Sequence, residues 1–315
     1  MVSAVFHSPR EVAAADVARA RPVRAPAADG ATAGAAAAAA TPAPAASPRR
    51  PPASGAWRRR WFAFWGAVLP AAGGIALLVG IWAVATAGGG AFPTPWATLQ
   101  AALALFADPF YRNGPNDVGI GWNVLNSLQR VGLGFGLAAL VGIPLGFLIG
   151  RFALVSRMFA PLISLLKPVS PLAWLPIGLL VFKAANPAAI WTIFICSIWP
   201  MVVNTAVGVQ RVPQDYLNVA RVLNLSEWKV LTRILLPAVL PYMLTGVRLS
   251  VGTAWLVIVA AEMLTGGTGI GFWVWDEWNN LNVQHILVAI FVIGIVGLLL
   301  EQALMLLARR FSHDG

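Results

Sequence analysis

Six apolar runs, each long enough to cross a lipid bilayer, constrain this chain more than any other feature of its sequence. They lie at about residues 61–86, 124–150, 160–182, 188–209, 238–264 and 285–308. A helix needs about 20 apolar residues to cross the hydrocarbon core. Only 11% of the residues are charged and 58% are hydrophobic, whereas about a quarter of a soluble domain is charged. We therefore predict an all-α membrane protein with six transmembrane helices.

The positive charges predict how these spans are oriented, because cytoplasmic loops carry an excess of Lys and Arg. At one set of span ends lie Arg151, Arg157, Arg211, Arg221, Lys229, Arg233, Arg309 and Arg310; at the other lie Arg112 and Lys183 beside Asp108, Asp117, Asp276 and Glu277. Both termini and the loop at 210–237 are therefore expected in the cytoplasm. The same asymmetry explains the net charge of +10. We therefore expect membrane lipid, and not nucleic acid, to be the partner of the basic residues.

An Ala/Pro/Arg-rich tail, residues 1–57, precedes the membrane region at 58–315. It contains the tract "ATAGAAAAAATPAPAASPRRPP" and no repeating apolar face. Such a segment buries too little apolar surface to offset the entropy of ordering its backbone. We predict a disordered cytoplasmic tail, with a basic targeting segment as the alternative.

The sequence lacks the usual signatures of catalysis and of cofactor binding. Lysine occurs only as Lys167, Lys183 and Lys229, none of which follows a glycine, so no G-x-x-x-x-G-K-[ST] phosphate loop is present. The three histidines and the single cysteine have no metal-ligand spacing. "GGTGIG" at 266–271 lacks the register of a dinucleotide loop, and we interpret it as a re-entrant turn. We expect a non-enzymatic chain without metal or cofactor.

Two spans carry residues that predict how the helices pack. Gly142, Gly146 and Gly150 recur every four residues, and a small-residue strip of this kind lets two helix backbones approach closely in lipid. The third span contains Pro161, Pro168, Pro171 and Pro176, so it must be kinked or broken. Broken backbone at membrane depth is tolerated only beside protein or a water-filled cavity. This span therefore either adjoins a transport pathway or is a kinked packing helix.

A polar stretch interrupts the apolar chain between the fourth and fifth spans, and reads "NVARVLNLSEWKVLTRILLP" at residues 218–237. Just before it, Pro213 and Asp215 favour the start of a helix. Asn224 favours a left-handed end to that helix, because Asn tolerates this conformation better than other non-glycine residues.

A second short helix is expected to follow at once. Ser226 can cap it, with Glu227 in its first turn, and Leu225 can pack on Val230 as a hydrophobic staple. Pro237 is expected to end the unit. The result would be two short helices joined by a tight turn on the cytoplasmic face, at about residues 213–237.

This spacing resembles the coupling loop of ABC-importer permeases, whose pattern is E-A-A, three residues, G, nine residues, then I-x-L-P. The present chain keeps the spacing but has Asn218 in place of Glu and Asn224 in place of Gly. The resemblance implies that this loop docks on an ATPase. The residues assigned to coupling are Asn218, Ala220, Arg221, Asn224, Leu225, Ser226, Glu227, Ile234, Leu236 and Pro237.

The resemblance extends over about residues 60–310. "PLISLLKPVSPLAWLPIGLLVF" looks like the third span of the nitrate, sulfonate and taurine permease group, and "VAAEMLTGGTGIGFWVWDEWNN" looks most like the nitrate-type branch. It implies a type I ABC-importer permease fold in the bacterial inner membrane. The implied partners are a second permease chain, expected to be an identical one, two ATP-binding subunits and a substrate-binding protein.

The implied substrate is a small anion, nitrate first, with nitrite or cyanate as further substrates. Sulfonates, taurine or bicarbonate are the alternatives within the group. An autonomous channel or secondary carrier is a different class, and it usually shows intramembrane acids or histidines for ion coupling. These spans offer little of that kind beyond Glu262.

Four residues are candidates for the pathway: Arg130, Lys167, Thr253 and Glu262. Arg130 and Arg248 could each draw an anion inward or extend to the membrane interface, and we favour the interfacial role. Glu262 could act as a gate, but we favour structural hydrogen bonding, since an acid in the pathway would repel an anion.

Overall fold

A computed structural model describes residues 54–90 and 92–312 of the chain. Within these ranges the chain is almost entirely helical, and no strand is formed beyond one isolated bridge between Arg112 and Val118. The chain divides into two compact units between Phe64 and Trp65. The predicted tail lies outside the described residues except for residues 54–57, which belong to the start of α2 (Ser54–Thr86).

Among the described residues, five helices are long and apolar enough to cross a membrane. The first lies in α2, followed by α4 (Ile120–Arg151), α7 (Ala185–Gln210), the continuous helix Glu227–Thr265, and α12 (Val283–Ser312). A sixth span is broken: α5 (Ala153–Leu166) meets η2 (Pro171–Trp174) and α6 (Leu175–Phe182) at a bend of 98°. Five of the six predicted spans are thus confirmed as single helices, and the predicted third span is a bent pair of helices that brings the number to six if the pair is counted as one span.

Prolines account for the break, since a proline removes a helical hydrogen bond and its ring collides with the preceding turn. Pro168 follows the end of α5 directly after Lys167, and Pro171 begins η2. The chain therefore leaves the direction of α5 before α6 begins, and α6 packs on α7, where Leu175 is buried against Ala188.

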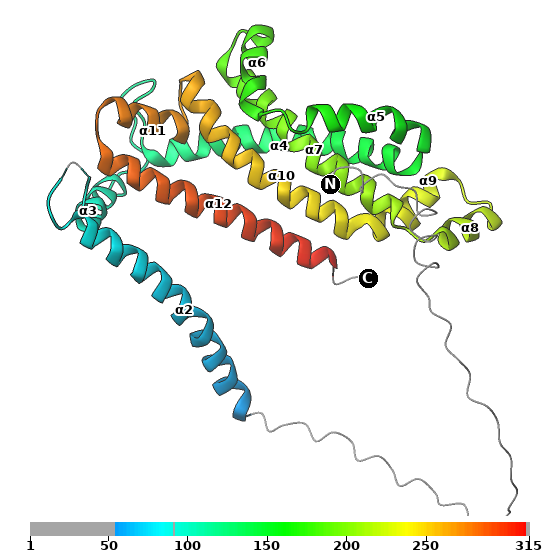
Figure 1. The fold of residues 1–315 in the computed structure, drawn as a ribbon, viewed down its shortest axis with the longest axis horizontal. Coiled ribbons are helices and arrows are strands. Elements are labelled where there is room, and N and C mark those ends of the chain that lie inside the picture. Colours follow the sequence, from blue (N-terminus) through cyan, green and yellow to red (C-terminus); the bar gives the residue numbers. More distant parts are fainter. Residues whose placement is uncertain (1–53, 91, 313–315) are drawn as a thin grey trace, which may run out of the picture. The chain divides into compact units, whose positions relative to one another are not determined.

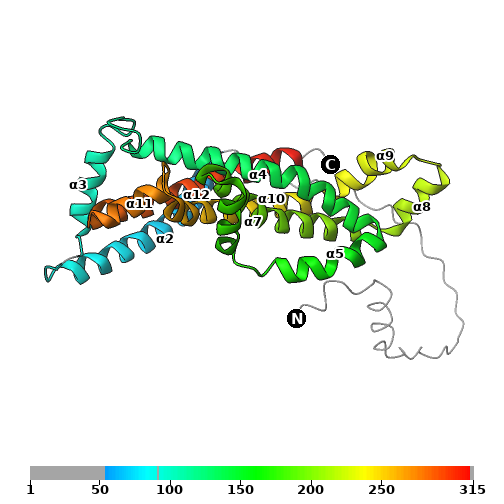
Figure 2. The same ribbon diagram turned by 90° about the horizontal axis from the view of Figure 1, so that it is seen from above.

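Helix α7 lies between α4 and α10 (Leu236–Thr265), as both views show (Figures 1 and 2). On the α4 side, an added Cβ at Gly146 would lie 2.6 Å from Cβ of Thr205. On the α10 side, an added Cβ at Gly208 would lie 2.7 Å from Cβ of Tyr242. The predicted glycine strip is therefore the surface through which α4 packs on α7, and α7 has a second close contact on its opposite face.

The short helices lie at the two ends of this layer. Helices α8 (Gln214–Val222) and α9 (Glu227–Val230) lie at one end, and α3 (Pro95–Leu105) and α11 (Ile270–Asn279) lie at the other (Figures 1 and 2). We call these the hairpin end and the outer end, the second named only for lying far from the hairpin.

Pro237 does not end the second short helix, so the prediction that it closes the unit is wrong. The chain continues from α9 through a π-helical segment, η3 (Leu231–Leu235), into α10, where Pro237 occupies the first turn. The N–H of Leu236 bonds to the carbonyl of Leu231, five residues back. This wider turn accommodates the proline ring, which would meet the carbonyl four residues earlier in an uninterrupted α-helix.

The close contact between α4 and α7 predicts a position-specific effect of substitution. Gly146→Val should destabilise the protein by about 1–3 kcal/mol, because its side chain must displace Thr205 and the carbonyl of Val202. Gly136→Val is the matched control, since nothing lies within 4 Å of an added Cβ at Gly136 on the same helix. Thermal unfolding of the two purified variants in detergent measures the difference. Equal midpoints would contradict the proposed packing.

Candidate functional site

The turn between α8 and α9 has the backbone that the sequence predicts. Asn224 has φ +52°, in the left-handed region. The N–H of Leu225 bonds to the carbonyl of Ala220 at 3.0 Å, which closes the end of α8. Ser226 caps α9, its hydroxyl accepting a hydrogen bond from the N–H of Lys229 at 3.4 Å. We call residues 213–230 the hairpin.

Apolar packing and one ion pair hold the hairpin against the membrane helices. Leu217, Ala220 and Val230 are buried in a cluster that also contains residues from α4, α7 and α10. Leu225 and Ile234 pack against this cluster. Arg151, the last residue of α4, lies 3.2 Å from Glu227 in the first turn of α9. The hairpin is therefore tied to three membrane helices.

The other face of the hairpin is exposed and largely apolar. Val222 is 86% exposed and Trp228 is 71% exposed. The remaining large apolar side chains exposed on it are Tyr216, Val219 and Leu223. Asn218, Arg221 and Lys229 are also exposed. Exposed apolar side chains rimmed by polar ones mark an interaction surface, so this face is suited to a protein partner.

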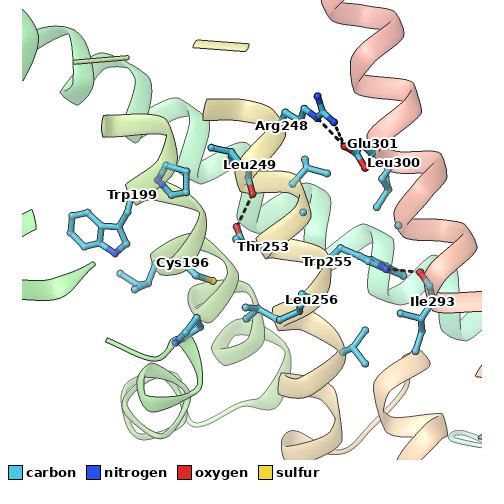
Figure 3. A pocket seen from close by; sticks show the side chains of 18 of the residues that line it. Cys196, Trp199, Arg248, Leu249, Thr253, Trp255, Leu256, Ile293, Leu300 and Glu301 are labelled. Carbon is cyan, nitrogen blue, oxygen red and sulfur yellow. Dashed lines mark hydrogen bonds and ion pairs between the residues drawn. The ribbon is translucent and has the colours of Figure 1, made fainter. Parts of the chain in front are cut away.

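A groove of about 1060 Å³ lies along α10, between η2 and α7 on one side and α12 on the other (Figure 3). Its lining is mostly apolar and includes Trp174 and Trp199. Of the residues that the structure describes, three charged ones line it, Lys167, Arg248 and Glu301. Two cations and one acid leave an excess of one positive charge, which suits an anion.

Arg248 and Glu301 form an ion pair inside the groove (Figure 3). Nε of Arg248 donates to Oε1 of Glu301 at 2.9 Å, and Nη2 donates to the same oxygen. Thr253 lies on the same helix as Arg248 and donates its hydroxyl to the carbonyl of Ser250 at 2.9 Å. Among the described residues, no acid lies within ion-pair distance of Lys167.

A second ion pair lies at the outer end, and its carboxylate is buried. Glu262 is 1% exposed and lies 2.5 Å from Nη1 of Arg130. Its carboxylate also accepts hydrogen bonds from the hydroxyl of Ser127 at 2.8 Å and the N–H of Gly271 at 3.0 Å. A buried carboxylate is stable only when it is paired and its remaining lone pairs are satisfied, and both conditions are met here.

The same cluster fixes the glycine-rich turn that leads into α11. Nη1 of Arg130 donates to the carbonyl of Thr268 at 2.5 Å, and its Nε donates to Asn186 at 2.7 Å. The N–H of Gly269 bonds to Asn123 at 2.9 Å. Gly269 has φ +146°, and an added Cβ would lie 2.3 Å from Cδ of Glu262. Only glycine fits this position, so "GGTGIG" forms a tight structural turn.

The structure separates the four candidate pathway residues into two groups. Lys167 and Thr253 line the groove, whereas Arg130 and Glu262 belong to the outer-end cluster. The favoured interpretation of Glu262 as a hydrogen-bonding residue agrees with its contacts. The favoured interfacial role of Arg130 is wrong, because its side chain is only 14% exposed and is held in the ion pair.

Sequence reasoning missed the role of Glu301 and the contact of Arg151 with Glu227. A signal for Glu301 was present, since it is an acid within the otherwise apolar run at 285–308. Its partner Arg248 lies 53 residues away, on another helix. Nothing in the sequence alone joins these two positions.

Six apolar spans, a broken third span and a rigid hairpin at one end define the permease subunit of an ABC importer. Residues 142–313 match the family described as "Binding-protein-dependent transport system inner membrane component". The chain belongs to this family, whose members are multi-pass inner-membrane transport subunits that work with a binding protein and with separate ATPase subunits.

The chain is also similar to individual permeases. The chain is 47% identical over 246 residues to the nitrate import permease protein NrtB of Leptolyngbya laminosa, covering 78% of this chain and 88% of the relative. It is 42% identical over 257 residues to the bicarbonate transport system permease protein CmpB of Synechococcus elongatus, covering 80% and 91%.

The fold is similar to that of a solved transporter. A chain of the inward-facing MetNI methionine ABC transporter superposes with a TM-score of 0.53 at 16% sequence identity, covering 61% of this chain and 95% of that chain. This likeness shows the type I ABC-importer permease fold.

We predict that replacing the acidic residue of each of the two ion pairs of α10 will lower the stability of the protein by different amounts. Glu262→Ala should destabilise the protein by about 3–5 kcal/mol, because it leaves the partly buried Arg130 without its partner. Glu301→Ala is the matched control and should cost about 0–1 kcal/mol, because the pair it breaks is half exposed. Thermal unfolding in detergent compares the variants. Similar losses would show that burial does not distinguish the pairs.

Proposed function

We propose that this chain is the permease of an ATP-driven nitrate importer. The observation that carries the proposal is its 47% identity, over 78% of its length, to a relative named as a nitrate import permease. The groove supports the same assignment. It is mostly apolar with one excess positive charge, so it suits a small, singly charged anion that is cheap to desolvate. Nitrite and cyanate share these properties.

Bicarbonate is the second candidate substrate. The chain is 42% identical to a bicarbonate permease over 80% of its length, and bicarbonate is also a small, planar, singly charged oxyanion. The same groove could therefore pass either ion, and the substrate-binding protein would supply most of the discrimination.

The hairpin is proposed to dock on an ATPase. Its apolar face is exposed while its base is fixed to α4, α7 and α10, so a partner that displaces it would displace those helices as well. The proposed assembly contains two identical permease chains and two ATPase subunits. Both termini are proposed to be cytoplasmic, on the side to which the Lys/Arg-rich loops belong.

Uptake of labelled nitrate tests the substrate. A strain that lacks this gene should lose nitrate uptake at low external nitrate, and the restored gene should return it. Bicarbonate uptake, and growth on a sulfonate or taurine, are measured in the same strains. Unchanged nitrate uptake with loss of one of the others would move the assignment to that substrate.

Two substitutions at one position test the coupling role of the hairpin. Asn224→Val should abolish most uptake and weaken copurification of the ATPase, because a β-branched residue is strained by roughly 1–2 kcal/mol at φ +52°. Asn224→Gly is the matched control and should retain both properties, since glycine adopts this conformation freely. Membrane amounts of both chains are compared by immunoblot. A valine variant that still binds its ATPase and transports normally would contradict the docking role.

A further inference from the structure

The charged side chains within the membrane-spanning parts of α10 and α12 have unequal surroundings. Glu262 is buried against Arg130 at the outer end. Arg248 and Glu301 lie farther from the helix ends, yet their side chains are 53% and 44% exposed. A charge at this depth is costly unless it faces water or a partner charge. Both side chains face the groove, so the groove is expected to hold water.

The Arg248–Glu301 pair is not needed to join the two helices that carry it. Trp255 of α10 donates its indole N–H to the carbonyl of Ile293 of α12 at 2.9 Å (Figure 3). The same indole packs on Gly297, where an added Cβ would lie 3.1 Å from the ring. The close contact between α10 and α12 therefore has its own anchor one to two turns from the ion pair.

The geometry of the pair leaves part of the guanidinium available. Nε and Nη2 of Arg248 donate to one oxygen of Glu301. A guanidinium has five N–H donors, so Nη1 and the second hydrogen of Nη2 are left without an acceptor among the described residues. Guanidinium groups bind planar oxyanions through paired, parallel hydrogen bonds. Arg248 can thus contact a passing oxyanion while Glu301 offsets part of its charge.

We infer that Arg248 is the anion-contacting residue of the groove and that Glu301 is its positioning residue, which keeps a singly charged oxyanion from being held too tightly. This inference rests on the proposed function. Lys167 would then provide the excess positive charge, and Thr253 a hydroxyl on the same helix. Glu301 orients the guanidinium and balances its charge without contacting the anion.

Chemical modification after folding tests the charge at position 248. The reference is Cys196→Ala, which removes the only cysteine of the chain, and the test variant adds Arg248→Cys. Both are assembled with their ATPase in right-side-out membrane vesicles loaded with ATP, with the binding protein added outside. Arg248→Cys should lower nitrate uptake at least about tenfold relative to the reference.

Two thiol reagents of similar size and opposite charge are then compared on the same vesicles. An ethylammonium methanethiosulfonate, which restores a cation, should recover uptake severalfold, and an ethylsulfonate methanethiosulfonate should not. Arg157→Cys in the reference chain is the matched control, since Arg157 is exposed on α5 and does not line the groove. Neither reagent should change its uptake.

Several outcomes would overturn the inference. Full uptake by Arg248→Cys is one, and equal effects of the two reagents on uptake are another. The third is a mass spectrum in which neither reagent has labelled Cys at position 248, because that result would exclude a hydrated groove. Failure of the proposed function looks different. A reference chain that moves bicarbonate but not nitrate would contradict the assignment of nitrate as the substrate. The two reagents would then be compared with bicarbonate as the transported ion, and that comparison would still decide the role of Arg248.

Discussion

The close packing of α7 between α4 and α10 is the contact on which the other features of the membrane region depend. Lipid gives two apolar helices no hydrophobic reason to associate, so they hold together through close van der Waals contact and hydrogen bonds. Glycines permit that contact on both faces of α7, at Gly146 of α4 and at Gly208 of α7 itself. The same three helices support the hairpin at one end and the buried cluster at the other. The groove lies along α10 in the same layer.

The two Arg–Glu ion pairs of α10 differ in their burial and in their hydrogen bonding, and these differences give them different structural roles. Glu262 is buried and Arg130 is partly buried, and every oxygen of the carboxylate is satisfied by a donor from another element. That pair fixes where α11 begins. Arg248 and Glu301 are half exposed, share only one carboxylate oxygen and face a groove. Their helices are already joined by Trp255, so this second pair is not needed to hold them together.

The sequence predicts those features that depend on residues close together along the chain. Span lengths, the break near Pro168, the glycine strip and the left-handed Asn224 all follow from local patterns, and the structure has each of them. Contacts between distant positions were not predictable in this way. Arg130 lies 132 residues from Glu262, and their pairing exists only because α4 and α10 converge at the outer end. The prediction that Pro237 ends a helix was wrong for a local reason, because a π-helical turn allows a helix to continue where a proline usually stops it.

Continuity of the helix from Glu227 to Thr265 connects the hairpin to both charged sites. At about 1.5 Å per residue, these 39 residues extend roughly 58 Å. One element therefore carries the capped base of the hairpin, then Arg248 and Thr253 in the groove, and finally Glu262 at the outer end. A rigid displacement of this helix would carry Arg248 with it, and Glu301 lies on a different helix. At the outer end, by contrast, the cluster around Glu262 ties α10 to α4 and α11 through several bonds at once. At the groove, α10 is joined to α7 by the hydroxyl of Ser250 and to α12 by the indole of Trp255 and the Arg248–Glu301 pair, and the half-exposed charges lie here.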